Sequence, residues 1–276
     1  MNWKKLLIGT WSWKRPFYSL GSIYLLLALY AYFLANQLIF QPPGTPYPDD
    51  QSHFTIIPAE EETIATYHRP ASPGMPTLLW SHGNAQNLGS LTSVLDDLHN
   101  HGYGVLSYDY PGYGLSSGKP TEKSCYHAIE TTYQHALSTL KIEPSHLILI
   151  GQSVGSGPTT WLAAKHEHHS VALIAPFLSA YRTVTHIPLF PGDRFPNHKN
   201  ITRVSSPLLV IHGEDDQVIP FKHGKRLFEL SPSQEKTFLP IPAAGHNNLF
   251  HNPSFDLPTL IQNHLWKKSP LTSISP

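Results

Sequence analysis

The segment LILIGQSVGSGPTT, residues 147–160, passes directly from bulky aliphatic side chains into small ones. Ser153 stands between Gly151 and Gly155 in the pattern G-x-S-x-G. This pattern is typical of a strand that turns sharply into a helix, with the serine projecting outward and glycines where any side chain would collide with neighbouring backbone. The segment predicts a nucleophilic serine at a strand end; the alternative is an ordinary serine at a helix N-terminus.

Similar apolar runs recur along the chain with helical patterns between them. The runs are continuous rather than alternating, which is typical of strands covered on both faces. They lie at residues 77–83, 104–110, 146–151, 171–176, 207–213 and 236–242, after a predicted hairpin of TIIPA (55–59) and TIATYHR (63–69). Helices are predicted at 88–100, 122–140, 156–167, 221–230 and 254–266. This alternation predicts an α/β fold with a mostly parallel central sheet flanked by helices.

A nucleophilic serine needs a base, and the base needs an acid that orients it. The strand in LLVIHGEDDQVIP (208–220) ends in a turn with Asp215 and Asp216, and AAGHNNL (243–249) carries His246 after the last strand. Both aspartates are also ordinary turn formers. The order Ser, Asp, His at successive strand ends nevertheless favours a catalytic triad.

Acyl transfer also needs an oxyanion hole made of two backbone N–H groups. One is expected from Val154, directly after the serine, and the other from the loop SHGNAQN (81–87), with Asn84 as the predicted donor. Together these residues predict Ser153, His246 and Asp216 or Asp215 as the catalytic set.

The N-terminal part of the chain differs in kind from the rest. No charged side chain occurs from Pro16 to Pro48, and residues 17–40 are apolar almost throughout, which is long enough for a membrane span. Lys4, Lys5, Lys14 and Arg15 precede this segment, so the positive-inside rule puts residues 1–16 in the cytoplasm and the rest on the periplasmic or lumenal side. A cleaved signal peptide is the competing interpretation.

We therefore expect a short cytoplasmic tail (1–16), a transmembrane signal anchor (17–40), a proline-rich linker (41–50) and one catalytic domain (51–276). The chain has 19 basic and 19 acidic side chains, which gives no electrostatic signature of a nucleic-acid partner. Cys125 is the only cysteine, so no intrachain disulfide is possible. We expect no metal at the histidine-rich run 165–170 and no nucleotide cofactor, because the glycines of residues 112–118 lack the G-x-G-x-x-G spacing.

These motifs together resemble the α/β-hydrolase superfamily over nearly all of the chain after residue 50. SHGNAQN, YDYPGYGLSSGKPTE, GQSVGSG, IHGEDDQVIPF and GHNNL are similar to a small, N-terminally anchored branch of abhydrolase-domain proteins, related to serine-aminopeptidase-like and monoacylglycerol-lipase-like hydrolases. The resemblance implies that the acid is Asp216, with Asp215 as the second choice, and that residues 108–118 form a structural loop at the pocket edge.

The chain departs from this branch in two respects. Some members are depalmitoylases that reach membranes through an N-terminal cysteine cluster, which is absent here. The 26 residues from 181 to 206 are short for a cap, so a minimal cap is expected. The predicted function is a membrane-anchored serine hydrolase acting on an acyl ester or thioester, a small or lipid-like substrate. The alternatives are a serine peptidase or amidase, or a noncatalytic binding scaffold.

Overall fold

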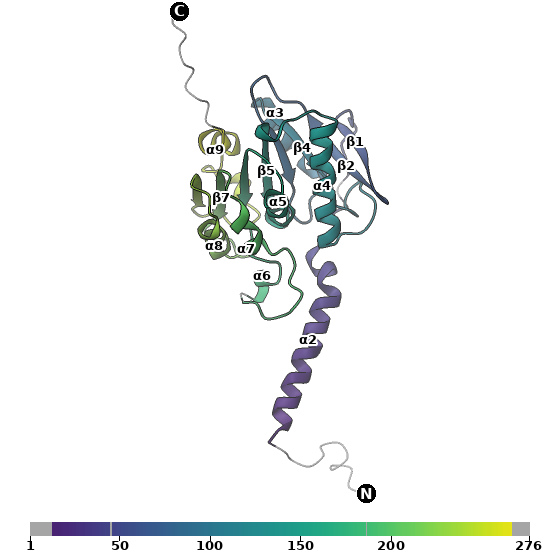
Figure 1. Cartoon of the computed structure of the whole chain (residues 1–276), viewed down its shortest axis with the longest axis vertical. Coiled ribbons are helices and arrows are strands. Elements are labelled where there is room, and N and C mark those ends of the chain that lie inside the picture. Colours follow the sequence, from purple (N-terminus) through teal and green to yellow (C-terminus); the bar gives the residue numbers. More distant parts are fainter. Residues whose placement is uncertain (1–12, 45, 186, 267–276) are drawn as a thin grey trace, which may run out of the picture.

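The computed structural model of the chain describes residues 13–44, 46–185 and 187–266. An eight-stranded sheet in the order β1-β2-β4-β3-β5-β6-β7-β8 organises this part of the chain (Figure 1). The strands are β1 (Phe54–Ala59), β2 (Glu62–Arg69), β3 (Thr77–Ser81), β4 (Gly104–Tyr108), β5 (Leu147–Gln152), β6 (Ser170–Ile174), β7 (Leu208–Gly213) and β8 (Lys236–Ile241). Strands β3 to β8 run parallel, whereas β1–β2 and β2–β4 are antiparallel. The predicted α/β fold with a mostly parallel sheet is confirmed.

Helices cover both faces of the sheet. The longer ones are α3 (Leu88–Asn100), α4 (Glu122–Ser138), α5 (Ser156–Ala163), α8 (Lys222–Leu230) and α9 (Leu257–His264). The short ones are α6 (Arg182–Thr185), α7 (Asn197–Asn200), η1 (Pro144–His146), η2 (Ser153–Gly155), η3 (Ile201–Arg203) and η4 (Leu249–His251). Helices α3 and α4 both begin at capping boxes, in which the cap residue and the third helical residue satisfy each other's amides.

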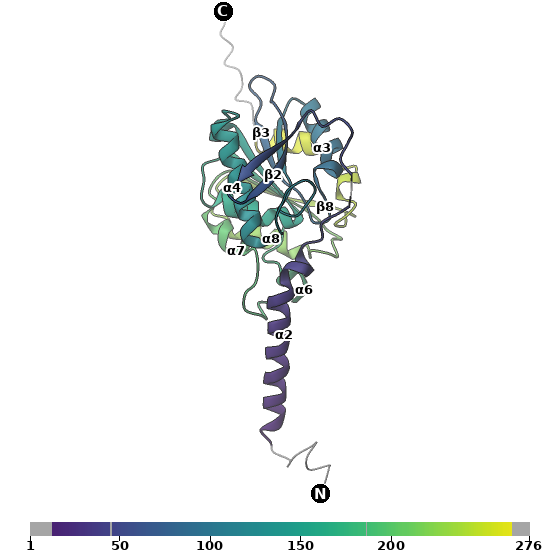
Figure 2. The same ribbon diagram turned by 90° about the vertical axis from the view of Figure 1, so that its right-hand side faces the viewer.

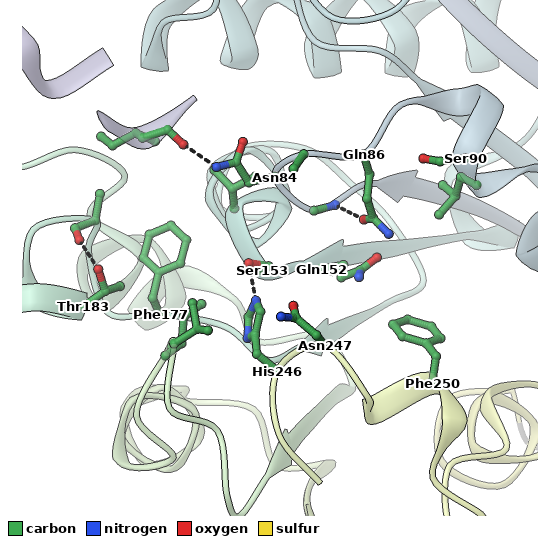
Figure 3. Close-up of a pocket in the computed structure, with 18 of the residues that line it drawn as sticks. Asn84, Gln86, Ser90, Gln152, Ser153, Phe177, Thr183, His246, Asn247 and Phe250 are labelled. Atoms are coloured by element: carbon green, nitrogen blue, oxygen red, sulfur yellow. Dashed lines mark hydrogen bonds between the residues drawn. The ribbon is translucent and has the colours of Figure 1, made fainter. Parts of the chain in front are cut away.

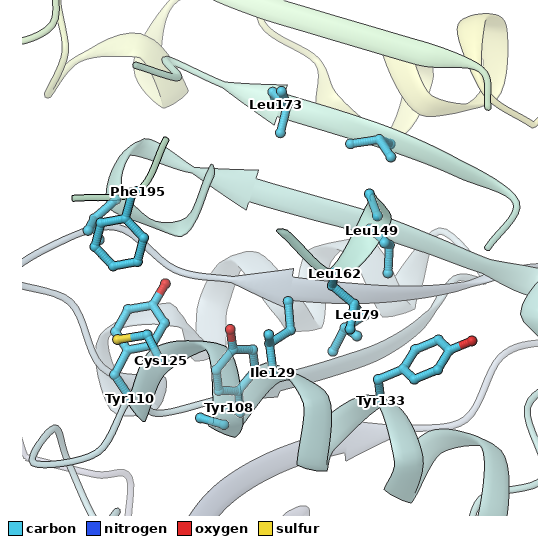
Figure 4. Packing of buried hydrophobic residues seen from close by; sticks show 14 of the residues in the cluster. Leu79, Tyr108, Tyr110, Cys125, Ile129, Tyr133, Leu149, Leu162, Leu173 and Phe195 are labelled. Atoms are coloured by element: carbon cyan, nitrogen blue, oxygen red, sulfur yellow. The ribbon is translucent and has the colours of Figure 1, made fainter. Parts of the chain in front are cut away.

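Two apolar cores result from the alternation of side chains along the strands. On one face Leu79 and Leu149 pack with Ile129 of α4 and Leu162 of α5 (Figure 4). On the other face, neighbouring strand residues such as Ile148 pack against α3 and α9. Strands β3 to β7 are buried on both faces and are therefore mostly apolar, and this is the pattern on which the sequence prediction depended.

Helix α2 (Arg15–Ile39) projects away from the sheet (Figures 1 and 2). It is the one helix among the described residues that is long and apolar enough to cross a membrane. Most of its large apolar side chains are exposed, but Phe40 at its end is buried in the core beside Phe195. Residues 1–12, most of the predicted cytoplasmic tail, lie outside the described residues.

The cap, residues 181–206, lies between β6 and β7 and contains the helices α6, α7 and η3. Asn197 fixes it to the rest of the fold. Its side-chain amide donates to the Phe177 carbonyl (2.9 Å) and the Ser156 hydroxyl (3.1 Å), and its oxygen accepts from the Thr160 hydroxyl (2.9 Å). The cap therefore rests directly on the start of helix α5, beside Ser153.

Candidate active site

Ser153 occupies the turn between β5 and α5, in a backbone conformation that is rare for a residue with a side chain. Its φ angle is +51°, in the left-handed region that costs roughly 1–3 kcal/mol outside glycine. The flanking glycines let the turn form. A Cβ on Gly151 would lie 2.8 Å from the Gly155 carbonyl oxygen, and a Cβ on Gly155 would overlap the Ser81 carbonyl. The sharp turn therefore depends on close backbone packing and leaves the serine side chain facing outward.

Three residues predicted from the sequence meet at the carboxyl ends of β5, β7 and β8. The Ser153 Oγ atom lies 3.0 Å from His246 Nε2 (Figure 3). On the other side of the imidazole, His246 Nδ1 lies 2.7 Å from Asp216 Oδ2. The carboxylate accepts a hydrogen bond from Nδ1–H, which leaves Nε2 as the acceptor for the serine proton. The arrangement can therefore move a proton from the serine hydroxyl to the imidazole.

Asp216 is buried, whereas its neighbour Asp215 is exposed. The Oδ1 atom of Asp216 accepts hydrogen bonds from the backbone amides of Val218 (2.9 Å) and Ile219 (2.8 Å), so Oδ2 is left for His246. No hydrogen bond joins the Asp215 side chain to His246 in the described chain. Of the two candidates, the geometry places Asp216 against the imidazole.

Burial by itself would raise the pKa of Asp216, but its hydrogen bonds oppose this effect. Contacts with His212 and His246, the charge of His246 and the Ile219 amide together hold the pKa of Asp216 well below its usual range. His212 was missed by the sequence analysis; its Nε2 lies 3.4 Å from Asp216 Oδ2 and 2.9 Å from the Ile219 carbonyl. Asp216 therefore remains ionised at every pH at which an imidazole titrates.

The loop after β3 carries Asn84, the predicted second oxyanion donor. Its side-chain amide donates to the Ile39 carbonyl (2.7 Å), and its side-chain oxygen accepts from the Tyr113 hydroxyl (2.7 Å) and the Gln41 amide (3.0 Å). Its backbone N–H has no acceptor among the described residues. The loop is thus held by the Asn84 side chain while the Asn84 amide stays free, and both Asn84 and Val154 line the same groove.

The buried carboxylate of Asp109, directly after β4, also contacts this region of the chain. Asp109 accepts hydrogen bonds from the Leu88 amide (2.9 Å) and the Tyr47 hydroxyl, and its Oδ1 lies 3.5 Å from His82 Nε2. Burial raises the pKa of Asp109 to about 7 and lowers the pKa of His82 to about 4. His82 belongs to the loop and Leu88 directly follows it, so these contacts hold the loop against the residue that follows β4.

A groove of about 1360 Å³ runs past Ser153. Ser153, Val154, Asn84 and His246 all line it. Sequence analysis missed most of its other walls, which come from helix α2, the cap, helix α3 and Gln86, Gln152 and Asn247 (Figure 3). No short motif marks these residues, because the groove forms only when segments distant in sequence pack together.

In the part of the chain that the structure describes, no group of three or more His, Cys, Asp or Glu side chains is arranged so that it could hold a metal ion. Two histidines of the run 165–170 have other partners. His166 lies 2.7 Å from Glu130, and His168 lies 2.7 Å from the Ser206 hydroxyl.

A family model of the alpha/beta hydrolase fold matches residues 76–186. The alpha/beta hydrolase domain-containing protein aho-3 of Caenorhabditis elegans is 40% identical over 192 residues, covering 67% of this chain and 56% of that protein. The human alpha/beta hydrolase domain-containing protein 17C is 40% identical over 181 residues, covering 63% of this chain and 53% of that protein. The chain thus spans about half the length of these relatives.

Solved structures show the same fold at low sequence identity. A monoacylglycerol lipase from Paleococcus ferrophilus has a TM-score of 0.57 at 20% identity, covering 74% of this chain and 99% of that chain. The esterase Pf2001 from Pyrococcus furiosus has a TM-score of 0.63 at 16% identity, covering 76% of this chain and 92% of that chain.

Proposed function

The chain belongs to the α/β-hydrolase superfamily, and on this premise we propose that it is a serine hydrolase that cleaves an acyl ester or thioester through an acyl-enzyme. The observation that carries the proposal is the continuous hydrogen-bonded series Ser153–His246–Asp216, at 3.0 and 2.7 Å. An ordinary turn serine needs neither the strained backbone at Ser153 nor a histidine oriented by a buried carboxylate.

In the first half of the reaction, His246 Nε2 takes the proton of Ser153 as Oγ attacks the acyl carbonyl carbon. The carbonyl oxygen becomes an oxyanion, which accepts hydrogen bonds from the backbone amides of Asn84 and Val154. Asp216 holds the Nδ1–H tautomer and stabilises the imidazolium that forms. The bond to the leaving group then breaks as His246 returns the proton to the leaving oxygen or sulfur.

In the second half, water replaces the leaving group. His246 removes a proton from the water as its oxygen attacks the acyl carbonyl, and the same two amides stabilise the second oxyanion. The bond between the acyl carbon and Ser153 Oγ breaks, Oγ regains a proton from His246, and the free acid leaves. Each step uses groups of this chain and water alone.

We further propose that helix α2 anchors the enzyme in a membrane, with residues 1–16 on the cytoplasmic side. Its length and composition, its exposed apolar side chains and the basic residues before it support this topology. An anchored site lies close to lipid, which favours a substrate with an apolar acyl group. We expect the full chain to resist extraction from membranes by carbonate. In sealed vesicles whose cytoplasmic face is outward, we expect the C-terminal domain to be protected from added protease.

Labelling with a tagged fluorophosphonate tests the serine mechanism, because this reagent reacts with an activated serine without requiring the natural substrate. Membranes containing the wild type, Ser153→Ala and His246→Ala are compared at equal protein levels. Labelling of the wild type alone supports the mechanism. Labelling of Ser153→Ala as strong as that of the wild type, or an unlabelled, folded wild type, would contradict it.

A further inference from the structure

Helix α2 forms one wall of the groove that contains Ser153. Its contributing residues recur every three or four positions and so share one face of the helix. They are Leu27, Tyr30, Ala31, Ala35, Leu38 and Ile39. A helix that served only as a membrane anchor would not need to line the groove of the candidate active site.

The cap forms the facing wall and is fastened to helix α2. The Tyr181 hydroxyl donates to the Ala31 carbonyl (3.0 Å), and the Tyr24 hydroxyl donates to the Leu189 carbonyl (3.1 Å). The Tyr24 ring also stacks on Phe190, with 5.9 Å between ring centroids. Tyr24 lies 15 residues before Ile39, or about 22 Å along the helix. The cap therefore lies beside the C-terminal part of α2 (Figure 1), and its contacts begin at the side chain of Tyr24.

Near Tyr32 the cap and helix are in close contact. The guanidinium of Arg194 lies 5.3 Å from the Tyr32 ring centroid, and a Cβ on Gly192 would lie 2.9 Å from that ring. The cap also carries exposed apolar side chains: Val184, which lines the groove, is 80% exposed, and Ile187 is 58% exposed. The cap and α2 thus present a shared apolar surface, which marks an interaction site.

The position of the groove along α2 corresponds to the depth of a bilayer. A hydrocarbon core needs about 20 helical residues, and 20 residues counted from Pro16, directly after Arg15, end at Ala35. Leu27 and Ala31 fall inside this stretch, so the α2 end of the groove lies at the level of lipid tails when the helix spans a membrane.

The groove also contains polar groups close to Ser153. The side chains of Gln86, Ser90, Gln152 and Asn247 line it there, next to apolar ones such as Phe250 (Figure 3). The Oε1 atom of Gln152 is buried without a hydrogen-bond partner among the described residues. A buried acceptor of this kind is satisfied when a donor occupies the groove. The polar groups beside Ser153 therefore suit a polar leaving group, and the α2 wall suits an apolar acyl chain.

We infer that the substrate is a membrane-resident lipid-like ester or thioester, whose acyl chain reaches Ser153 laterally from the bilayer through the passage between helix α2 and the cap. Its polar leaving group lies toward Gln152 and Asn247. This inference rests on the proposed serine-hydrolase function and adds to it the route and orientation of the substrate. The α2 wall contacts the acyl chain and so sets the preference for chain length.

Leu27 and Leu29 offer a matched pair of variants for the test. They are 51% and 44% exposed, and about 200° apart around the helix, but only Leu27 lines the groove. The full chain in phosphatidylcholine vesicles is assayed with the 4-nitrophenyl esters of butyric and palmitic acid. Fluorophosphonate labelling gives the amount of active serine in each sample.

For Leu27→Trp we expect the ratio of palmitate to butyrate kcat/KM to fall at least tenfold, because each methylene kept out of the groove weakens binding about fourfold. Leu29→Trp should keep the wild-type ratio. Wild-type palmitate turnover should also fall in proportion when inert lipid is added to the vesicles at constant bulk substrate, because lateral access depends on the mole fraction in the bilayer.

The inference would be overturned if Leu27→Trp and Leu29→Trp had equal ratios of palmitate to butyrate kcat/KM. It would also be overturned if palmitate turnover did not depend on the mole fraction of substrate in the bilayer. Failure of the proposed serine-hydrolase function would give a different result: Ser153→Ala would still hydrolyse the butyrate ester.

Discussion

Replacing Asp216 by asparagine should disable the candidate active site while keeping its shape. The two amides of Val218 and Ile219, at 2.9 and 2.8 Å, require an oxygen at the Oδ1 position. The amide nitrogen of the new side chain would therefore face His246 Nδ1, where Oδ2 now lies at 2.7 Å. A donor at this position favours the tautomer with the proton on Nε2, which cannot accept the proton of Ser153.

The expected loss in kcat is about 10⁴-fold, or about 5 kcal/mol of transition-state stabilisation. Hydrolysis of 4-nitrophenyl butyrate by the full chain measures it, with the rate of fluorophosphonate labelling as a second readout. Asp215→Asn is the matched control, because it removes the same charge from the neighbouring residue, whose side chain is exposed. A loss below tenfold in Asp216→Asn, or an equal loss in Asp215→Asn, would refute the assignment of the acid.

Three further predictions concern the surroundings of the site. Gly155→Ala should destabilise the protein by about 1–3 kcal/mol in thermal unfolding and slow fluorophosphonate labelling, because the new Cβ overlaps the Ser81 carbonyl; an unchanged melting temperature would contradict this. Asp109, with its pKa raised to about 7, stays protonated in the folded state between about pH 4 and 7 while the unfolded chain ionises. The contribution of Asp109 to the free energy of unfolding should then fall by up to about 4 kcal/mol as pH rises through this window. The free energy of unfolding of the wild type should therefore fall by this amount relative to that of Asp109→Asn; parallel pH profiles of the two proteins would disprove it. Burial raises the pKa of Cys125, so N-ethylmaleimide should neither modify the folded protein nor inhibit it, as mass spectrometry and activity would report.

Local patterns in the sequence were sufficient to predict the sheet and the turn that carries Ser153. Strands β3 to β7 are buried on both faces, so a mostly apolar run marks each of them. The longer helices after β2 begin and end within a few residues of the predicted limits. Glycines at 151 and 155 were informative because the turn leaves no room for a side chain at either position. These features depend on near neighbours in the chain.

The choice between Asp215 and Asp216 could not be made from spacing alone. Both follow the same strand, and only the fold shows that one is exposed and the other accepts the amides of residues 218 and 219. The contact of His212 with Asp216 was missed for the same reason. Such a contact depends on how the turn after β7 folds back on its own strand, which no local pattern records.

The groove could not be predicted from the sequence because its walls come from segments that are far apart in the chain. The apolar segment 17–40 predicted a membrane helix from its composition, but composition does not indicate what one face of a helix contacts. The contact becomes visible only when the cap, more than 140 residues later, packs beside Tyr24 and Ala31.

The end of helix α2 also connects the proposed anchor to the proposed chemistry. The Ile39 carbonyl and the Gln41 amide, one on each side of Phe40, both bind the side chain of Asn84, while Phe40 itself is buried in the core. The backbone amide of Asn84 is the proposed oxyanion donor, and such a donor is effective only when it is held in place before the reaction. A displacement of the helix end would therefore move the oxyanion loop with it. This coupling explains why an apolar helix that projects from the domain ends in buried, specific contacts instead of a flexible linker.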